Sequence, residues 1–184
     1  MGKVITAQQA VELIRDGDIF AVDGFKCSAI PEEIFVRLRE RYDATGTPKG
    51  LTYFAAPSLG AEGRGTDRLG VEGLISKFIC SHAAISPSIS ALAMENKLEC
   101  YMLPMGNCIR MMQASASGEP GIITHVGLET FADPLIEGSK VNDAAKASQE
   151  EIVRRIQIDG KNYLYYSAIH PNICFIKASF ADSN

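Results

Sequence analysis

The alternation of short apolar runs with helix-like segments most constrains what this chain can fold into. Runs that are apolar on both faces are typical of parallel strands covered on both sides by helices. Four such runs occur: Ile19–Val22, Leu51–Ala55, Phe78–Cys80 and Cys100–Leu103. Because helical patterns separate them, we expect an α/β fold with an open, mostly parallel sheet and helices on both faces.

Local signals place the helices. Thr6 and Gln9 form the pattern of a capping box, which predicts a helix through about Arg15. Pro31 suits a first helical position, and the acidic residues after it favour the positive end of the helix dipole. Two further helices are expected, Pro87–Met94 after Ser86 and Asn107–Ala116.

The last third of the chain breaks this alternation. In residues 118–149 the regular alternation lapses into sequence that is punctuated by Gly and Pro. The segment Ile156–Tyr166 predicts a β-hairpin that turns at Asp159 and Gly160, because this dipeptide suits the positive φ angles of a tight turn. A final strand is expected at Ile173–Ala178. The length of 184 residues fits a single domain, 1–184.

Composition excludes several classes of partner. The net charge is −4 and the basic residues are scattered, so neither nucleic acid nor an anionic membrane surface is expected to bind. No apolar run approaches the roughly 20 residues that span a bilayer, and the N-terminus lacks the pattern of a secretory signal. We therefore expect a cytoplasmic protein.

The cysteines and histidines do not form a metal-binding pattern. Five cysteines at wide spacing, mostly in apolar surroundings, indicate buried, reduced and inert thiols. The three histidines, His82, His125 and His170, are each some forty residues apart. No Cys-x-x-Cys occurs, so no metal is predicted.

The turns after Val22, Ala55 and Leu103 are the candidate ligand site, since open α/β sheets bind ligands at the carboxyl ends of their strands. In the first turn, Gly24 would let a ligand approach the backbone and Lys26 could face a carboxylate or phosphate. Alternatively, Gly24 only relieves a tight turn and Lys26 is solvated. The local pattern alone favours this second interpretation.

The order of motifs resembles family I coenzyme A transferases of the short-chain acyl-CoA:acetate or propionate and 3-ketoacid type. That family has a Gly-Gly-Phe-Gly turn followed by Ile-Pro-Glu, which matches Gly24, Phe25 and Ile30–Glu32 without a gap. Leu103–Gly106 looks like the family's Pro-Gln-Gly segment, and Gly118–Pro134 looks like the segment after it. The hairpin residues Gly160–Tyr166 and Pro171 also fit, so the resemblance covers nearly the whole chain.

The resemblance implies transfer of coenzyme A from a short-chain acyl-CoA to acetate, propionate or a 3-ketoacid through a glutamyl-CoA intermediate. Coenzyme A is then a substrate, and no other cofactor is expected. The nucleophilic glutamate belongs to the second half of such enzymes, so the catalytic residue is expected outside this chain. The resemblance also predicts a truncated N-terminal half that needs its C-terminal half or a second subunit and that forms homo- or hetero-oligomers.

The substrate-binding residues implied by the resemblance lie in three turns. They are Asp23, Gly24, Phe25, Lys26, Pro57, Pro104, Met105 and Gly106. Asp23 replaces the family's first glycine, and its charge would oppose a developing oxyanion unless it points away or Lys26 neutralises it. Met105 stands where the family commonly has glutamine, which removes an amide that could donate to the substrate.

Two alternatives remain open at this stage. A non-catalytic protein that binds CoA esters, or a scaffold, would share the architecture, and the residues at positions 23 and 105 favour it. A sugar-phosphate isomerase on a similar sheet rests on fold analogy alone. None of the glutamates has a context that marks it as the nucleophile; Glu129 lies in a segment that could approach the site, but a solvated role is favoured.

Overall fold

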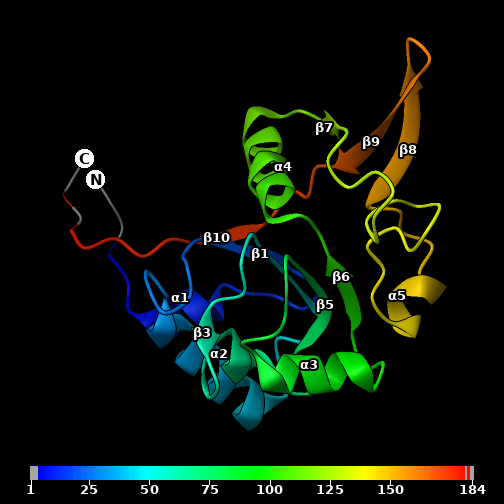
Figure 1. Cartoon of the computed structure of the whole chain (residues 1–184). Helices are drawn as coiled ribbons and strands as arrows, with labels where there is room; N and C mark the ends of the chain where they lie inside the picture. Colours follow the sequence, from blue (N-terminus) through cyan, green and yellow to red (C-terminus); the bar gives the residue numbers. More distant parts are fainter. Residues whose placement is uncertain (1–3, 181, 183–184) are drawn as a thin grey trace.

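A computed structural model of the chain describes residues 4–180 and 182. Its centre is a five-stranded, wholly parallel sheet (Figure 1). The strand order is β10 (Ile173–Phe175), β1 (Ile19–Val22), β2 (Leu51–Ala55), β5 (Ile75–Cys80) and β6 (Glu99–Met102). The predicted α/β architecture is therefore confirmed.

Three helices cover one face of this sheet: α1 (Ala7–Glu12), α2 (Glu32–Thr45) and α3 (Pro87–Met94). The core under them includes Phe20, Tyr53 and Phe78, whose side chains are fully buried. The rings of Tyr53 and Phe78 stack with centroids 5.0 Å apart. This layer has the dense packing of a protein interior.

The helix ends differ slightly from the expectation. The capping box of Thr6 and Gln9 forms as predicted, but α1 ends at Glu12 rather than near Arg15. The carboxylate of Asp18 accepts the backbone N–H of Arg15 at 2.8 Å, so a turn takes the place of the last helical residues. Pro31 is the N-cap of α2 and not its first helical residue.

The opposite face is covered by α4 (Met105–Ser117) together with a separate antiparallel sheet. That sheet has the order β7 (Gly121–Thr124), β9 (Lys161–Ser167) and β8 (Val153–Ile158). The predicted hairpin is therefore confirmed, although it begins earlier than expected, and it extends away from the parallel sheet (Figure 1). Helices lie on both faces as predicted, but α4 shares its face with these strands.

The segment 118–149 contains two elements that the sequence did not predict, β7 and the short helix α5 (Asp143–Ala147). β7 has only four residues and pairs with β9, some forty residues later, so no local pattern marks it. Its Gly121 has φ +158° and lies directly against the backbone of Tyr166. The final strand is also shorter than predicted and ends at Phe175.

The loop after β2 folds into a compact unit that Glu32 holds in place. It contains β3 (Gly60–Ala61), β4 (Arg64–Gly65) and a 3-10 helix, η1 (Thr66–Leu69). The carboxylate of Glu32 accepts the N–H of Gly65 at 2.7 Å and pairs with Arg68 at 2.6 Å. Across the described residues, no helix has the length and apolar character to cross a membrane, and no cluster of three potential metal ligands occurs.

Candidate functional site

The ends of β1 and β2 and the start of α4 enclose a hollow of about 310 Å³. Asp23, Gly24 and Phe25 contribute from the turn after β1, Pro57 from the turn after β2, and Met105 from the first turn of α4. Five of the eight residues named from the sequence are thus brought together, although they come from three distant segments. Ile109, Met112 and Gln113 of α4 complete the wall, with Val22 and Ala56.

A second hollow, of about 430 Å³, shares Val22, Asp23 and Met112 with the first. Its other wall is β10, with Cys174, Phe175 and the following Ile176. It lies where the direction of strand addition reverses. From β1 the chain adds β2, β5 and β6 on one side, and then adds β10 on the other side of β1. Such a switch point is a characteristic ligand position in open α/β sheets.

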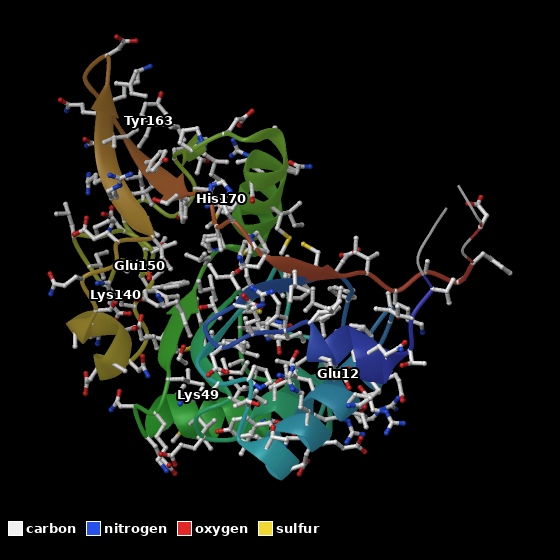
Figure 2. The ribbon with its side chains drawn as sticks, turned by 180° about the vertical axis from the view of Figure 1, so that it is seen from behind. Glu12, Lys49, Lys140, Glu150, Tyr163 and His170 are labelled. Atoms are coloured by element: carbon white, nitrogen blue, oxygen red, sulfur yellow. The ribbon has the colours of Figure 1, made fainter. Side chains whose placement is uncertain are left out.

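The sequence did not single out the β10 and α4 residues that line this second hollow. The pairing of β10 with β1 joins residues about 150 positions apart, so it leaves no local signal. At Ser115, which lines the second hollow, the side chain makes a polar contact: its Oγ lies 3.2 Å from Nδ1 of His170. Figure 2 shows His170 between the small antiparallel sheet and the final strand.

Gly24 is required by the geometry of its turn. Its φ is +147°, a region that residues with a side chain rarely adopt. A Cβ at this position would lie 3.0 Å from the carbonyl oxygen of Ser28 and 3.2 Å from a methyl of Leu59. The backbones of Phe25 and Ser28 exchange two hydrogen bonds, which closes the turn. Relief of a tight turn therefore accounts for Gly24 without any ligand.

The Asp23 carboxylate folds back onto its own turn. Oδ1 accepts the N–H of Gly24 at 2.8 Å, so this amide already has a partner. Lys26 does not pair with Asp23 in the part of the chain that the structure describes; its ammonium lies 5.9 Å from the centre of the Phe25 ring. The expected neutralisation of Asp23 by Lys26 is therefore absent, and Asp23 remains as a charge at the wall of both hollows.

Lys26, Pro104 and Gly106 do not line either hollow. Pro104 is the N-cap of α4, and its carbonyl accepts the N–H groups of Asn107 and Cys108. A Cβ on Gly106 would meet no atom within 4 Å, so no close approach requires glycine there. Pro104 thus sets the start of α4, which places the partly exposed Met105 at the hollow.

The acidic residues outside the site have structural partners. Asp133 is buried and accepts the N–H groups of Glu129 and Leu135, and Arg155 pairs with it at 3.0 Å. Burial alone would raise the pKa of the Asp133 carboxyl, but these donors and the charge of Arg155 hold it below its ordinary value. Glu129 is exposed. No glutamate is among the described residues that line the two hollows.

The thiols follow the expectation only in part. Cys80, Cys100 and Cys108 are buried, and burial raises the pKa of Cys80 to about 12 and that of Cys100 to about 11. Such thiols are poor nucleophiles at neutral pH. Cys27 and Cys174 are exposed, contrary to the prediction; Cys27 lies in the turn after β1, and Cys174 lies in β10, the edge strand of the sheet.

Together, the parallel sheet and the apolar hollow at its strand ends define an α/β protein with a candidate binding site for a small organic ligand. The family model described as "Coenzyme A transferase" matches residues 4–184. The chain therefore belongs to the coenzyme A transferase family, as its motifs indicated.

Three known proteins illustrate the relationship. The caffeate CoA-transferase of Acetobacterium woodii is 35% identical over all of this chain and 35% of its own length. The crystal structure of the acyl-CoA transferase YdiF from E. coli O157:H7, in a thioester complex with CoA, superimposes with a TM-score of 0.88 at 36% identity, covering 94% of this chain and 33% of that one. The chain thus spans about a third of these relatives.

The third relative is named as a subunit. The acetate CoA-transferase subunit alpha of E. coli K12 is 24% identical over 98% of this chain and 72% of its own length. The same region of the family thus occurs both inside a long chain and in a separate subunit.

Proposed function

We propose that this chain forms the N-terminal, acyl-binding half of a CoA-transferase that exchanges coenzyme A between a short-chain acyl-CoA and a carboxylic acid such as acetate, propionate or a 3-ketoacid. The observation that carries the proposal is the apolar hollow where the turns after β1 and β2 meet α4. Membership in the family and the likeness to a CoA thioester complex support it.

In the proposed reaction, a glutamate from the other half attacks the thioester carbonyl and the CoA thiolate leaves, which gives a mixed anhydride. The thiolate then attacks the glutamyl carbonyl, and the original acid leaves as a carboxylate. The carboxylate of a second acid attacks this glutamyl thioester and expels the thiolate, which gives a second mixed anhydride. The thiolate then attacks the acyl carbonyl of that anhydride, and the glutamate leaves as a free carboxylate. Every bond broken is matched by one formed, so no oxidant or further cofactor is needed.

The part of this chain in the proposed mechanism is to bind and orient the acyl group. Phe25, Met105 and Ile109 are partly exposed apolar side chains around the hollow, and a short acyl chain would cover them. The partner half is either the rest of a longer chain or a second subunit. The absence of a glutamate from both described linings agrees with a nucleophile supplied by that partner.

The test is to combine the chain with the complementary half of the enzyme, add acetoacetyl-CoA or propionyl-CoA, trap with borohydride and search for a modified glutamate by mass spectrometry. We expect a thioester-derived mass change on the complementary half and none on residues of this chain. A complete complex that binds the esters yet forms no adduct would contradict transfer.

That contrary outcome would favour the second candidate, a CoA-ester-binding protein without activity. Two observations favour this candidate. Asp23 engages the N–H of Gly24, and Met105 brings no donor to the hollow. A sugar-phosphate isomerase gains no support, because no lining residue of either hollow carries the positive charge that a phosphate would need.

A further inference from the structure

Among the described residues that line the two hollows, Asp23 is the only charged one. The remaining walls come from Gly24, from aliphatic, aromatic and thioether side chains, from the thiol of Cys174 and from the uncharged Gln113 and Ser115. Asp23 also stands in the wall that both hollows share, so a group that occupies either one lies beside its carboxylate. The electrostatic character of the site therefore depends on this one side chain.

The carboxylate has spare capacity for a ligand. An ionised carboxylate has two oxygens and about four lone-pair positions. Oδ1 accepts the N–H of Gly24 at 2.8 Å, whereas within residues 4–180 and 182 nothing donates to Oδ2 and no cation pairs with either oxygen. The charge thus has neither a salt bridge nor a full set of donors. A ligand that brought a cation or a donor would supply what the protein does not.

Asp23 is exposed, so water screens its charge in the free protein. A ligand group that fills the hollow beside Phe25 and Met112 would displace part of this water and would meet a lower dielectric than in bulk water. A second negative charge placed there would be repelled and would lose hydration without gaining a partner. A positive charge would be attracted and would gain a hydrogen-bond acceptor.

From this geometry, and resting on the function proposed above, we infer that Asp23 determines which acyl groups the site accepts. It favours acyl groups that carry an ammonium at their far end and disfavours those that carry a second carboxylate. Uncharged acyl groups fall between the two. The substrate class is accordingly monocarboxylic acids that are neutral or amino-substituted, and dicarboxylic acids are disfavoured.

Three CoA esters of nearly equal size test the inference: β-alanyl-CoA, propionyl-CoA and succinyl-CoA, which differ in a terminal ammonium, methyl or carboxylate. Their dissociation constants for this chain are measured by isothermal titration calorimetry at low salt. We expect β-alanyl-CoA to bind on the order of tenfold more tightly than succinyl-CoA, with propionyl-CoA between them. Since all three share the CoA moiety, its phosphates cancel from the ratio.

Asp23→Asn removes the charge and keeps an oxygen that can accept the N–H of Gly24, so the turn is preserved. We expect this variant to bring the ratio to about one. Glu12→Gln is the matched control, because it removes an equal charge from exposed α1 on the far face of the sheet (Figure 2) and should leave the ratio unchanged. Thermal unfolding of both variants checks that the fold is intact.

The outcomes separate the two proposals. If propionyl-CoA binds but the ratio is near one in the parent protein, or is unaffected by Asp23→Asn, the inference about Asp23 is wrong while the proposed function stands. If none of the three esters binds, the inference is wrong, and the proposed function is then decided by the borohydride experiment on the complete complex. A ratio that moves as much in Glu12→Gln as in Asp23→Asn would show a long-range charge effect and would also overturn it.

Discussion

The two faces of the parallel sheet are built differently. Under α1–α3 the core is closed, and Phe20, Tyr53 and Phe78 have no exposed surface. On the other face, α4 packs on the sheet through Met111 but leaves hollows at the strand ends, beside the partly exposed Met105. One face thus supplies stability, and the other supplies space for a ligand.

Connectivity explains this division. Two helices of the closed face, α2 and α3, each follow a strand and lead to its neighbour in the sheet, and α1 precedes β1. Crossovers between parallel strands are right-handed as a rule, which places α2 and α3 on the same side. The other face is covered by a single long segment of the chain, residues 103–172, which runs between β6 and β10 and is called the excursion below. This segment shares a buried core with the sheet, and the hollows lie beyond that core, at the carboxyl ends of β1 and β2.

The largest effect should follow from a cavity in the closed face. Phe78→Ala removes a fully buried ring that stacks on Tyr53, and we expect it to lower the free energy of unfolding by about 3 to 5 kcal/mol in urea titrations. Met111→Ala on the other face should cost less, about 2 to 3 kcal/mol, because α4 can relax toward the neighbouring hollows. A larger loss of unfolding free energy for Met111→Ala than for Phe78→Ala would contradict the difference drawn between the two faces.

A buried charge should make the excursion sensitive to acid. Asp133→Asn weakens the contacts with Arg155 and with two backbone N–H groups, and we expect a loss of about 2 to 3 kcal/mol at pH 7. Because the pKa of Asp133 is lowered on folding, its contribution is present above about pH 4 and is lost as the pH falls further. Unfolding of both proteins at pH 7 and pH 3 should therefore show a difference that shrinks in acid.

The matched control is Glu119→Gln on the exposed turn after α4. It removes one carboxylate from the same layer without a buried partner, so its effect should stay within about 0.5 kcal/mol. An equal loss in the control, or a difference that persists undiminished at pH 3, would contradict the role given to Asp133.

A substitution at the site should affect binding more than stability. Gly24→Ala places a Cβ against the carbonyl of Ser28 in a strained backbone conformation, with an expected cost of about 1 to 3 kcal/mol. Movement of the turn would also disturb the hollow, so titration with propionyl-CoA should show weaker binding. Gly46→Ala is the control, because that glycine also has a positive φ but lies at the end of α2 with open space around it. Unchanged ester binding in Gly24→Ala would argue against this turn as part of the site.

The smallest effect concerns the contact at the end of the second hollow. Ser115→Ala removes the interaction with His170, and we expect a loss of about 0.5 to 1 kcal/mol because the pair is exposed. Ser117→Ala, which loses a bond to a carbonyl of its own helix, provides the comparison. A clearly larger loss at Ser115 would mean that the excursion depends on this single contact.

The elements that the sequence could predict and those that it could not also differ between the two faces of the sheet. The strands and helices of the closed face came from local signals, such as the apolar run Ile19–Val22 and the capping box at Thr6. The turn residues Asp23–Phe25 could be placed at the site because strand ends share one edge. In contrast, β7 and the β10 wall depend on pairings between distant residues, and the hydrogen bond from Gly24 to Asp23 depends on a side-chain rotamer. No pattern along the chain encodes these.

The pairing of β10 with β1 has a consequence for the order of folding. The backbone N–H of Ile19 binds the side chain of Asn172, so the edge of the sheet joins residues 153 positions apart. Loop closure over such a distance is slow compared with the formation of neighbouring strand-helix units. On the ribosome, β1 must wait without its edge partner until nearly all of these residues have been made. The second hollow is accordingly among the last features to form.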